Sequence, residues 1–282
     1  MRWFIVKEGS SPETLSLGEF LRARRERLTP EDVGLPFYGR RRTPGLRREE
    51  VAQMAHIGTS WYTSLEQGRV SNPSDQVLDS LAIALRLSSG ERRHLYTLAR
   101  PVERELVHAS QEVTLGLERT VLALDPNPAL VLGSSWDMLL WNKAAELVFR
   151  LPAFTKDRVL KPNWLRRFLT DSETRRNNPD WEAKAQVMIA RFRADYAYFQ
   201  QDSRFNELIE ELLRTSEAFR EHWPKHDVQI TVDCHKRWTN PSIGEMEFEY
   251  VTLQQPDHPG IKIVIYTASP ATGLRLKDLL EM

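Results

Sequence analysis

The sequence predicts a mainly α-helical protein in two parts, an all-helical N-terminal part followed by an α+β part. Apolar residues recur at helical spacing through residues 17–100, whereas an alternation of period two takes over between residues 228 and 266. The length of 282 residues also exceeds the size at which one compact core is usual. Two domains of different fold class are therefore expected.

Five short helices account for the N-terminal part. Leu17, Phe20 and Leu21 form the apolar side of the first helix, whose arginines are expected to face outward. The prolines and glycines of residues 28–46 predict an extended loop after it. Ser74 stands where a helix N-cap is expected. The five helices cover residues 17–27, 48–55, Thr59 up to Gly68, 74–87 and 88–100.

Residues 40–69 contain two short helical patterns separated by a tight connection. In the second pattern Ile57, Trp61 and Leu65 recur every four residues, so they share one side of a helix. The opposite side holds Thr59, Tyr62, Thr63 and Glu66. One side can pack on a core while the other offers hydroxyl groups to a groove. This is the layout of a helix-turn-helix.

Arginine is concentrated in the same part of the chain. Between Arg22 and Arg48 there are nine arginines and three acidic residues. Residues 1–100 carry a net charge of +4 and residues 101–282 a net charge of −4, although the whole chain is neutral. Arginine binds phosphate and guanine in a bidentate manner, so DNA binding by the first part alone is the favoured interpretation. The alternatives are a solvated charged face and a helical protein-interaction module.

Four segments carry a family resemblance: LGEFLRARRERLTPEDVGL, GRRRTPGLRREEVA, TSWYTSLEQGR and PSDQVLDSLAIALRL. They resemble the N-terminal domain of the MmyB-like bacterial transcription regulators, which is an XRE-type helix-turn-helix. The resemblance extends from Leu17 to Arg100. This chain has His56 where the family usually has Gly, and Gly58 where it usually has Ser. His56 must then adopt the turn without the freedom of glycine, and the Ser cap is lost unless Thr59 replaces it.

The residues expected to contact DNA form two groups. Base recognition is assigned to the start of the second helix of the motif, at Thr59, Ser60, Tyr62 and Thr63, because hydroxyl groups and a thymine-facing methyl or ring suit base edges. Phosphate contacts are assigned to Arg40, Arg41, Arg42, Arg47, Arg48 and Arg69. Glu66 would repel DNA, so it is expected to hold an arginine or backbone groups within the domain.

The C-terminal part predicts strands at both ends and helices between them. Residues 129–149 indicate two strands followed by a helix that starts near Asn142, and residues 179–201 indicate a long helix. Alternation predicts strands at residues 228–235 and 245–252, while residues 261–266 are apolar on both faces, as in a central strand. An antiparallel sheet of about five strands is expected. Composition alone supports only an α+β class.

The resemblance extends to this part through VLGSSWDMLLWN, DWEAKAQVMIARFR, SEAFREHWPKHDV and PSIGEMEFEYVTL. These segments are similar to the ligand-binding domain of the MmyB-like regulators. The resemblance implies a PAS-like α+β domain whose ligands are fatty acyl compounds. The family commonly has His before a proline where this chain has Asn240 before Pro241, so a role of that histidine does not transfer.

Large apolar side chains are the candidate walls of a pocket for an apolar ligand, although each one alone suits an ordinary core. A carboxylate head group would need a cation or an amide, for which Asn142, Arg193 and His226 are candidates. The apolar candidates are Trp136, Trp141, Phe149, Trp164, Phe168, Phe192, Tyr196, Tyr250 and Tyr266.

An enzyme is the less favoured alternative, and so is a C-terminal domain that serves only dimerisation. Cys234 and His235 point to opposite faces of a strand, and Pro224 interrupts the spacing between His222 and His226. Neither pair therefore suits a thiol or metal site. No catalytic residue, metal or cofactor is expected, beyond a fatty acid or similar apolar effector.

The remaining expectations concern organisation and location. The single cysteine and the absence of a signal peptide or membrane-spanning pattern favour a cytoplasmic protein without a membrane partner. The chain is expected to bind an operator as a homodimer. Its predicted divisions are a flexible leader (1–16), a helix-turn-helix domain (17–100), a linker helix (101–128) and a PAS-like ligand-binding domain (129–282).

Overall fold

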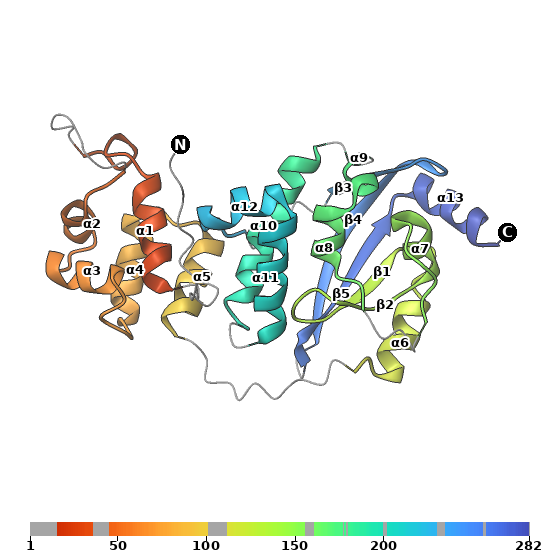
Figure 1. The fold of residues 1–282 in the computed structure, drawn as a ribbon, viewed down its shortest axis with the longest axis horizontal. Coiled ribbons are helices and arrows are strands. Elements are labelled where there is room, and N and C mark those ends of the chain that lie inside the picture. The colour runs from red at the N-terminus through yellow and green to blue at the C-terminus, as the bar shows by residue number, and fades with distance from the viewer. Residues whose placement is uncertain are drawn as a thin grey trace.

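The computed structural model shows two groups of elements, with the N-terminal helices at one end and a β-sheet at the other (Figure 1). It describes residues 16–35, 45–100, 112–155, 161–176, 178, 180–199, 202–229, 235–255 and 258–281. The predicted leader, except its last residue, and the loop that carries Arg40, Arg41 and Arg42 lie outside the described residues.

The five predicted N-terminal helices are confirmed. Ser16, Ser74 and Ser88 each cap a helix by accepting a hydrogen bond from a backbone amide in its first turn. The elements are α1 (Leu17–Arg27), a 3₁₀ turn η1 (Glu31–Val33), α2 (Arg48–Met54), α3 (Thr59–Glu66), α4 (Asp75–Ala84) and α5 (Ser89–Ala99).

Two glycines allow α1 to pack closely on its neighbours. A Cβ atom at Gly18 would lie 2.3 Å from the carbonyl oxygen of Glu66 at the end of α3. Gly45 has a φ of +76°, and a Cβ there would lie 2.5 Å from the backbone of Glu26. Since backbone atoms cannot move aside easily, only glycine fits at either place. The close approach sets the position of α3 and of the chain that leads into α2.

The C-terminal domain contains the predicted five-stranded antiparallel sheet, in the order β2-β1-β5-β4-β3. The apolar strand predicted at residues 261–266 lies in the centre, as expected. Of the strand predicted at residues 228–235, residues 230–234 lie outside the described ones; Val228 and Gln229 are not in a strand, and β3 begins at His235. The strands are β1 (Ala129–Leu132), β2 (Met138–Trp141), β3 (His235–Asn240), β4 (Gly244–Gln255) and β5 (His258–Ala268).

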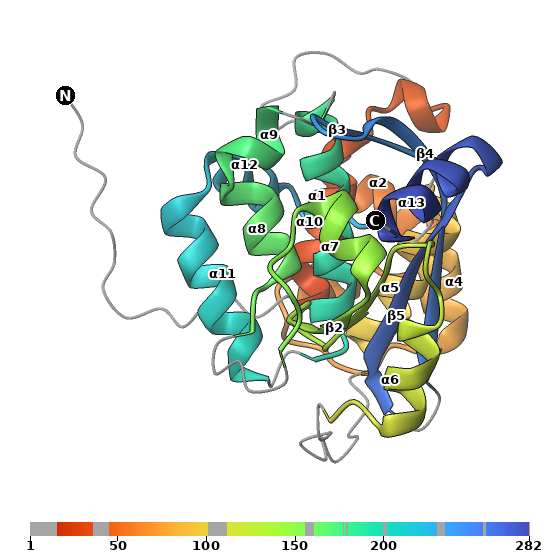
Figure 2. The same cartoon turned by 90° about the vertical axis from the view of Figure 1, so that its right-hand side faces the viewer.

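Helices cover both faces of the sheet. The helix predicted in the linker is α6 (Leu115–Leu122), and its Val121 packs with Ala129 and Val131 on one face. On the other face, α7 (Lys143–Phe149) and α13 (Pro270–Glu281) pack on Leu130, Phe248 and Tyr266. Figure 2 looks onto this end of the molecule, with α6, α7 and α13 nearest the viewer. No helix was expected at residues 270–281, which form α13.

A helical layer lies between the sheet and the N-terminal helices (Figure 1). Its buried residues form one connected apolar cluster with those of the N-terminal domain. The two domains are therefore joined by packing as well as by the chain. The layer consists of α8 (Trp164–Thr170), α9 (Ser172–Arg176), α10 (Trp181–Tyr196), α11 (Ser203–Thr215), α12 (Glu217–His222) and a 3₁₀ turn η2 (Trp223–Lys225).

Candidate DNA-binding surface and ligand-binding core

The start of α3 is the exposed part of the helix-turn-helix. Thr59 and Ser60 are exposed, and Thr63 is half-buried one turn later. Arg47 and Arg69 are also exposed, before α2 and after α3 respectively. Gly58 precedes α3 without offering a side-chain cap, and Thr59 is already the first helical residue. The first amide groups of α3 therefore have no side-chain cap, and the end of the helix faces outward beside two hydroxyl groups.

The turn before α3 contains the predicted strain. His56 has a φ of +55°, a conformation that costs a residue with a side chain more than it costs glycine. The amide of His56 donates to the carbonyl of Gln53, and the amide of Ile57 donates to that of Ala52. These two backbone hydrogen bonds stabilise the turn, in which His56 lacks the conformational freedom of glycine.

The assignment of Tyr62 to base recognition is wrong for the free protein. Its side chain is fully buried, at 0% exposure, together with Leu65 and Glu66. Trp61, predicted to face the core, is only half-buried. Because α3 packs against both α1 and α2, its buried side is rotated from the one that the four-residue spacing indicated.

A buried ion pair network fixes the recognition helix from inside. Arg25 donates to both carboxylate oxygens of Glu66, at 2.7 and 3.0 Å, and Arg48 lies 2.8 Å from the same carboxylate. Burial alone would raise the pKa of Glu66, but the hydrogen bonds and charges of the two arginines hold that pKa below its usual value. The expectation that Glu66 binds an arginine within the domain is confirmed.

Two arginine assignments change as a result. Arg48 already serves Glu66 in the free protein, which weakens its assignment as a phosphate ligand. The arginines of α1 were expected to face outward, yet Arg24 and Arg25 are 1% and 6% exposed. Their role was not predictable from local spacing, because their carboxylate partners lie far away along the chain.

The aromatic candidates form two clusters rather than one ring around a cavity. Trp164 packs against both clusters and contacts Phe149, with ring centres 5.2 Å apart. Trp141, Phe149 and Tyr266 belong to the cluster on the sheet, and Tyr250 packs against it. Trp136, Phe168, Phe192 and Tyr196 belong to the helical cluster.

Asn142 does not suit the head group of a ligand. Its buried side chain caps α7 by accepting from the amides of Ala129 and Ala145, and it donates to the carbonyl of Asn127. These bonds join β1, β2 and α7, and they use the amide group on both sides. The prediction is therefore replaced by a structural role.

Arg193 and His226 do come together, but at the boundary between the domains. Their Nη1 and Nδ1 atoms are 3.5 Å apart, and Arg193 donates to the backbone carbonyl of Trp223. Arg193 is 1% exposed and its guanidinium lies 3.9 Å from the centre of the Trp223 ring. Burial, and then repulsion from Arg24, lower the pKa of Arg193 to about 9. Neither residue belongs to the cluster on the sheet.

Two family models match the chain and together cover most of the described elements. The model of the MmyB-like transcription regulator ligand binding domain matches residues 113–277, and that of a helix-turn-helix domain matches residues 16–95. The chain belongs to the MmyB-like transcription regulators. No curated protein matches this MmyB-like regulator.

Two further findings bear on the other expectations for the MmyB-like regulator. Among the helices within the described ranges, none combines the length and the apolar character that crossing a membrane requires. The described residues also contain no group of three or more histidine, cysteine, aspartate or glutamate side chains placed to bind a metal. Cys234, one residue of the alternative thiol site, lies outside them.

His94 predicts how the stability of the MmyB-like regulator depends on pH. Burial, followed by the charges of Arg193 and Arg24, lowers its pKa to about 3, and His226 and Glu91 also face it. At pH values between the two pKa values, His94 is therefore neutral in the folded protein but protonated in the unfolded chain. Through His94, the free energy of unfolding should fall by about 1.4 kcal/mol per pH unit as the pH falls from about 6.5 towards 4. His226, whose pKa is lowered to about 4 by burial and then by Arg193, adds a loss of the same sign. Urea unfolding at successive pH values measures this slope.

The histidine variants isolate the contribution of His94 to that slope. His94→Leu should reduce the slope by about 1.4 kcal/mol per pH unit between about pH 6 and 5, where carboxylates with lowered pKa values, such as Glu66, remain ionised, and should leave the part that His226 contributes. His56→Asn, which changes an exposed histidine in a turn that asparagine tolerates, should leave the slope as it is. An unchanged slope in the His94→Leu protein would show that another group causes it.

Proposed function

We propose that the protein recognises an operator with the start of α3 and changes its affinity when a fatty acyl compound binds to the C-terminal domain. The observation that carries the DNA-binding half is the exposed pair Thr59 and Ser60 at the uncapped start of α3, with exposed Arg47 and Arg69 on either side. Hydroxyl groups suit base edges and guanidinium groups suit phosphates. Arg40, Arg41 and Arg42 remain proposed phosphate ligands, although they lie outside the described residues.

The proposed ligand is an acyl chain held in a PAS-like domain. Support comes from the match to a ligand-binding domain and from the two adjacent aromatic clusters. Trp164 packs against both clusters, and we propose that the acyl chain lies near it, between the sheet and the helical layer. Each buried methylene contributes about 0.8 kcal/mol, so the domain would respond to chain length.

A C-terminal domain that only dimerises is the second candidate. Val251 and Leu253, in the second half of β4, are 41% and 49% exposed and give this strand an exposed apolar stretch. Two copies of a helix-turn-helix commonly bind two half-sites. The proposed regulator is a homodimer in either case, and the candidates differ in whether a ligand alters DNA binding.

Substitutions on the helix-turn-helix should separate base contacts from phosphate contacts. Arg47→Gln should weaken binding to all duplexes alike and reduce the salt slope by about 1, because one phosphate contact is lost. Ser60→Ala should cost about 1–3 kcal/mol on the preferred sequence and relax its specificity. Fluorescence anisotropy, with duplexes selected from a random pool, measures both.

The controls test the position of the surface and the burial of Tyr62. Lys277→Gln removes an exposed charge on α13, at the end of the molecule away from α3 (Figure 1), and should not change the salt slope. Tyr62→Phe should leave specificity unchanged because the ring is buried. Equal losses for Arg47→Gln and Lys277→Gln would contradict the proposed surface.

Native mass spectrometry of protein purified from cells tests the ligand. We expect a dimer that carries a fatty acyl compound, and for the delipidated protein an affinity that rises by about fourfold per added methylene until the chain outgrows the site. Tryptophan fluorescence follows the titration, since Trp136, Trp141 and Trp164 lie in or against the clusters. A dimer without lipid, which binds no fatty acid of any length, would support the second candidate instead.

A further inference from the structure

A group of charged side chains lies where the N-terminal helices meet the helical layer of the C-terminal domain. Arg24 on α1 is 1% exposed, and its Nη1 atom lies 3.3 Å from Glu91 on α5 and 3.4 Å from Asp227. It also donates to the backbone carbonyl of His226. A single buried guanidinium thus binds one carboxylate of its own domain and two groups of the other domain.

The segment that receives Arg24 is itself held in an unusual conformation. His226 has a φ of +53°, which is costly for a residue with a side chain. Arg193 of α10 binds the carbonyl of Trp223 just before it, and the His226 ring lies 3.5 Å from the same arginine. The segment from Trp223 to Asp227 is therefore fixed by arginines from both sides of the boundary.

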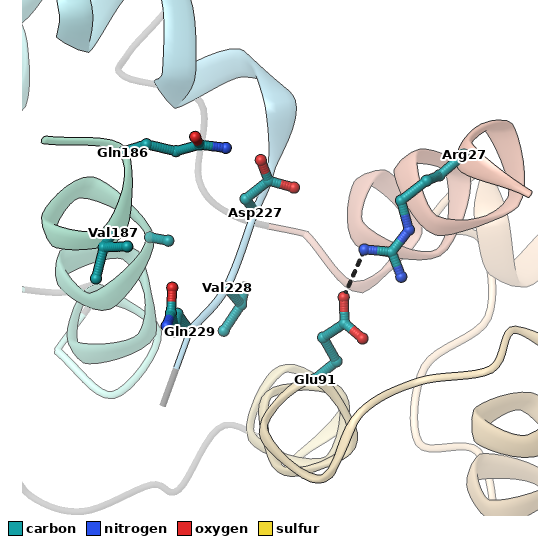
Figure 3. A pocket seen from close by; sticks show the side chains of 8 residues that line it. Arg27, Glu91, Gln186, Val187, Asp227, Val228 and Gln229 are labelled. Atoms are coloured by element: carbon teal, nitrogen blue, oxygen red, sulfur yellow. Dashed lines mark hydrogen bonds and ion pairs between the residues drawn. The ribbon is translucent and has the colours of Figure 1, made fainter. Parts of the chain in front are cut away.

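A pocket of about 370 Å³ opens beside these charges (Figure 3). Arg27 and Glu91, which are 2.8 Å apart, form one wall, and Asp227, Val228 and Gln229 form another. The carboxylates that bind Arg24, those of Glu91 and Asp227, both line this pocket. Gln186, Val187 and Ala190 of α10 complete the lining.

The physical character of this boundary makes it suitable for opening and closing. Attraction between buried charges is largely offset by the water they lose, and separated charges regain that water. Opening at the charged contacts therefore costs less than the number of ion pairs suggests. Keeping Arg24 buried without Asp227 would be costly, so the contact favours one relative orientation of the domains over nearby alternatives.

We propose that Arg24, Glu91 and Asp227 form an interdomain latch, which holds the DNA-binding domain in one orientation on the ligand-binding domain and opens when α10 moves. On α10, Phe192 lies in the helical aromatic cluster, against Trp136, and the next residue, Arg193, holds the latch segment. A change of packing around Phe192 would thus shift α10 and, through Arg193, the segment that contains Asp227. This coupling rests on the proposed ligand function, whereas the latch itself does not.

Asp227→Asn and Arg24→Met in the full chain test the latch without ligand or DNA. Both variants should increase the radius of gyration in small-angle X-ray scattering and split a single calorimetric transition into two. Amides of α1 should exchange hydrogen about tenfold faster in both. Asp227 is 36% exposed and lies outside the DNA-binding domain, so its variant keeps the test valid if Arg24→Met disturbs the folding of α1.

Asp79→Asn is the matched control, because Asp79 is an exposed partner of Arg92 within the N-terminal domain. It should leave the radius of gyration and the single transition unchanged. The latch would be overturned if both Asp227→Asn and Arg24→Met kept the wild-type radius of gyration, the single calorimetric transition and the wild-type hydrogen exchange of α1. If the scattering and calorimetric changes occur but no fatty acid binds, the proposed ligand fails and the latch stands.

Discussion

Two consecutive buried arginines on α1 connect the recognition helix to the rest of the protein. Arg25 binds Glu66 at the end of α3, and Arg24 binds Asp227 of the ligand-binding domain. Neighbouring residues of a helix point about 100° apart, so one rigid element can serve both partners. Gly18 allows α3 to approach this helix closely. The orientation of α3 and the contact between the domains therefore depend on the position of α1.

The energetics of these contacts explain why each arginine has a carboxylate partner. A guanidinium removed from water is stabilised only by good hydrogen-bond geometry and opposite charge. Glu66 meets this requirement with two arginines, which fixes the end of α3 against α1 and α2. Asp227 meets it less closely and remains 36% exposed beside a pocket. The Arg25–Glu66 contact suits a rigid DNA-binding domain. The Arg24–Asp227 contact suits a boundary between domains that can open.

Periodicity predicted most elements because helices and strands depend on local spacing. The five N-terminal helices, the central strand and the cap at Ser74 followed from this spacing. Spacing did not predict the burial of Tyr62, Arg24 and Arg25, because that burial depends on partners distant in the sequence. The polar edge strand β3 has a weak hydropathic pattern, so the alternation did not predict it beyond its first residue, His235. Most of the aromatic candidates are buried, with Trp164 and Tyr250 half-buried, but only the tertiary structure shows that they divide into two clusters.

The central claim is that the C-terminal domain controls DNA binding through a bound apolar molecule. The most direct measurement compares the operator affinity of delipidated protein with that of protein saturated with the fatty acid it prefers, at one fixed salt concentration. A coupling of about 1–3 kcal/mol predicts a change of roughly 5–150-fold. Equal affinities for the two forms would contradict the claim.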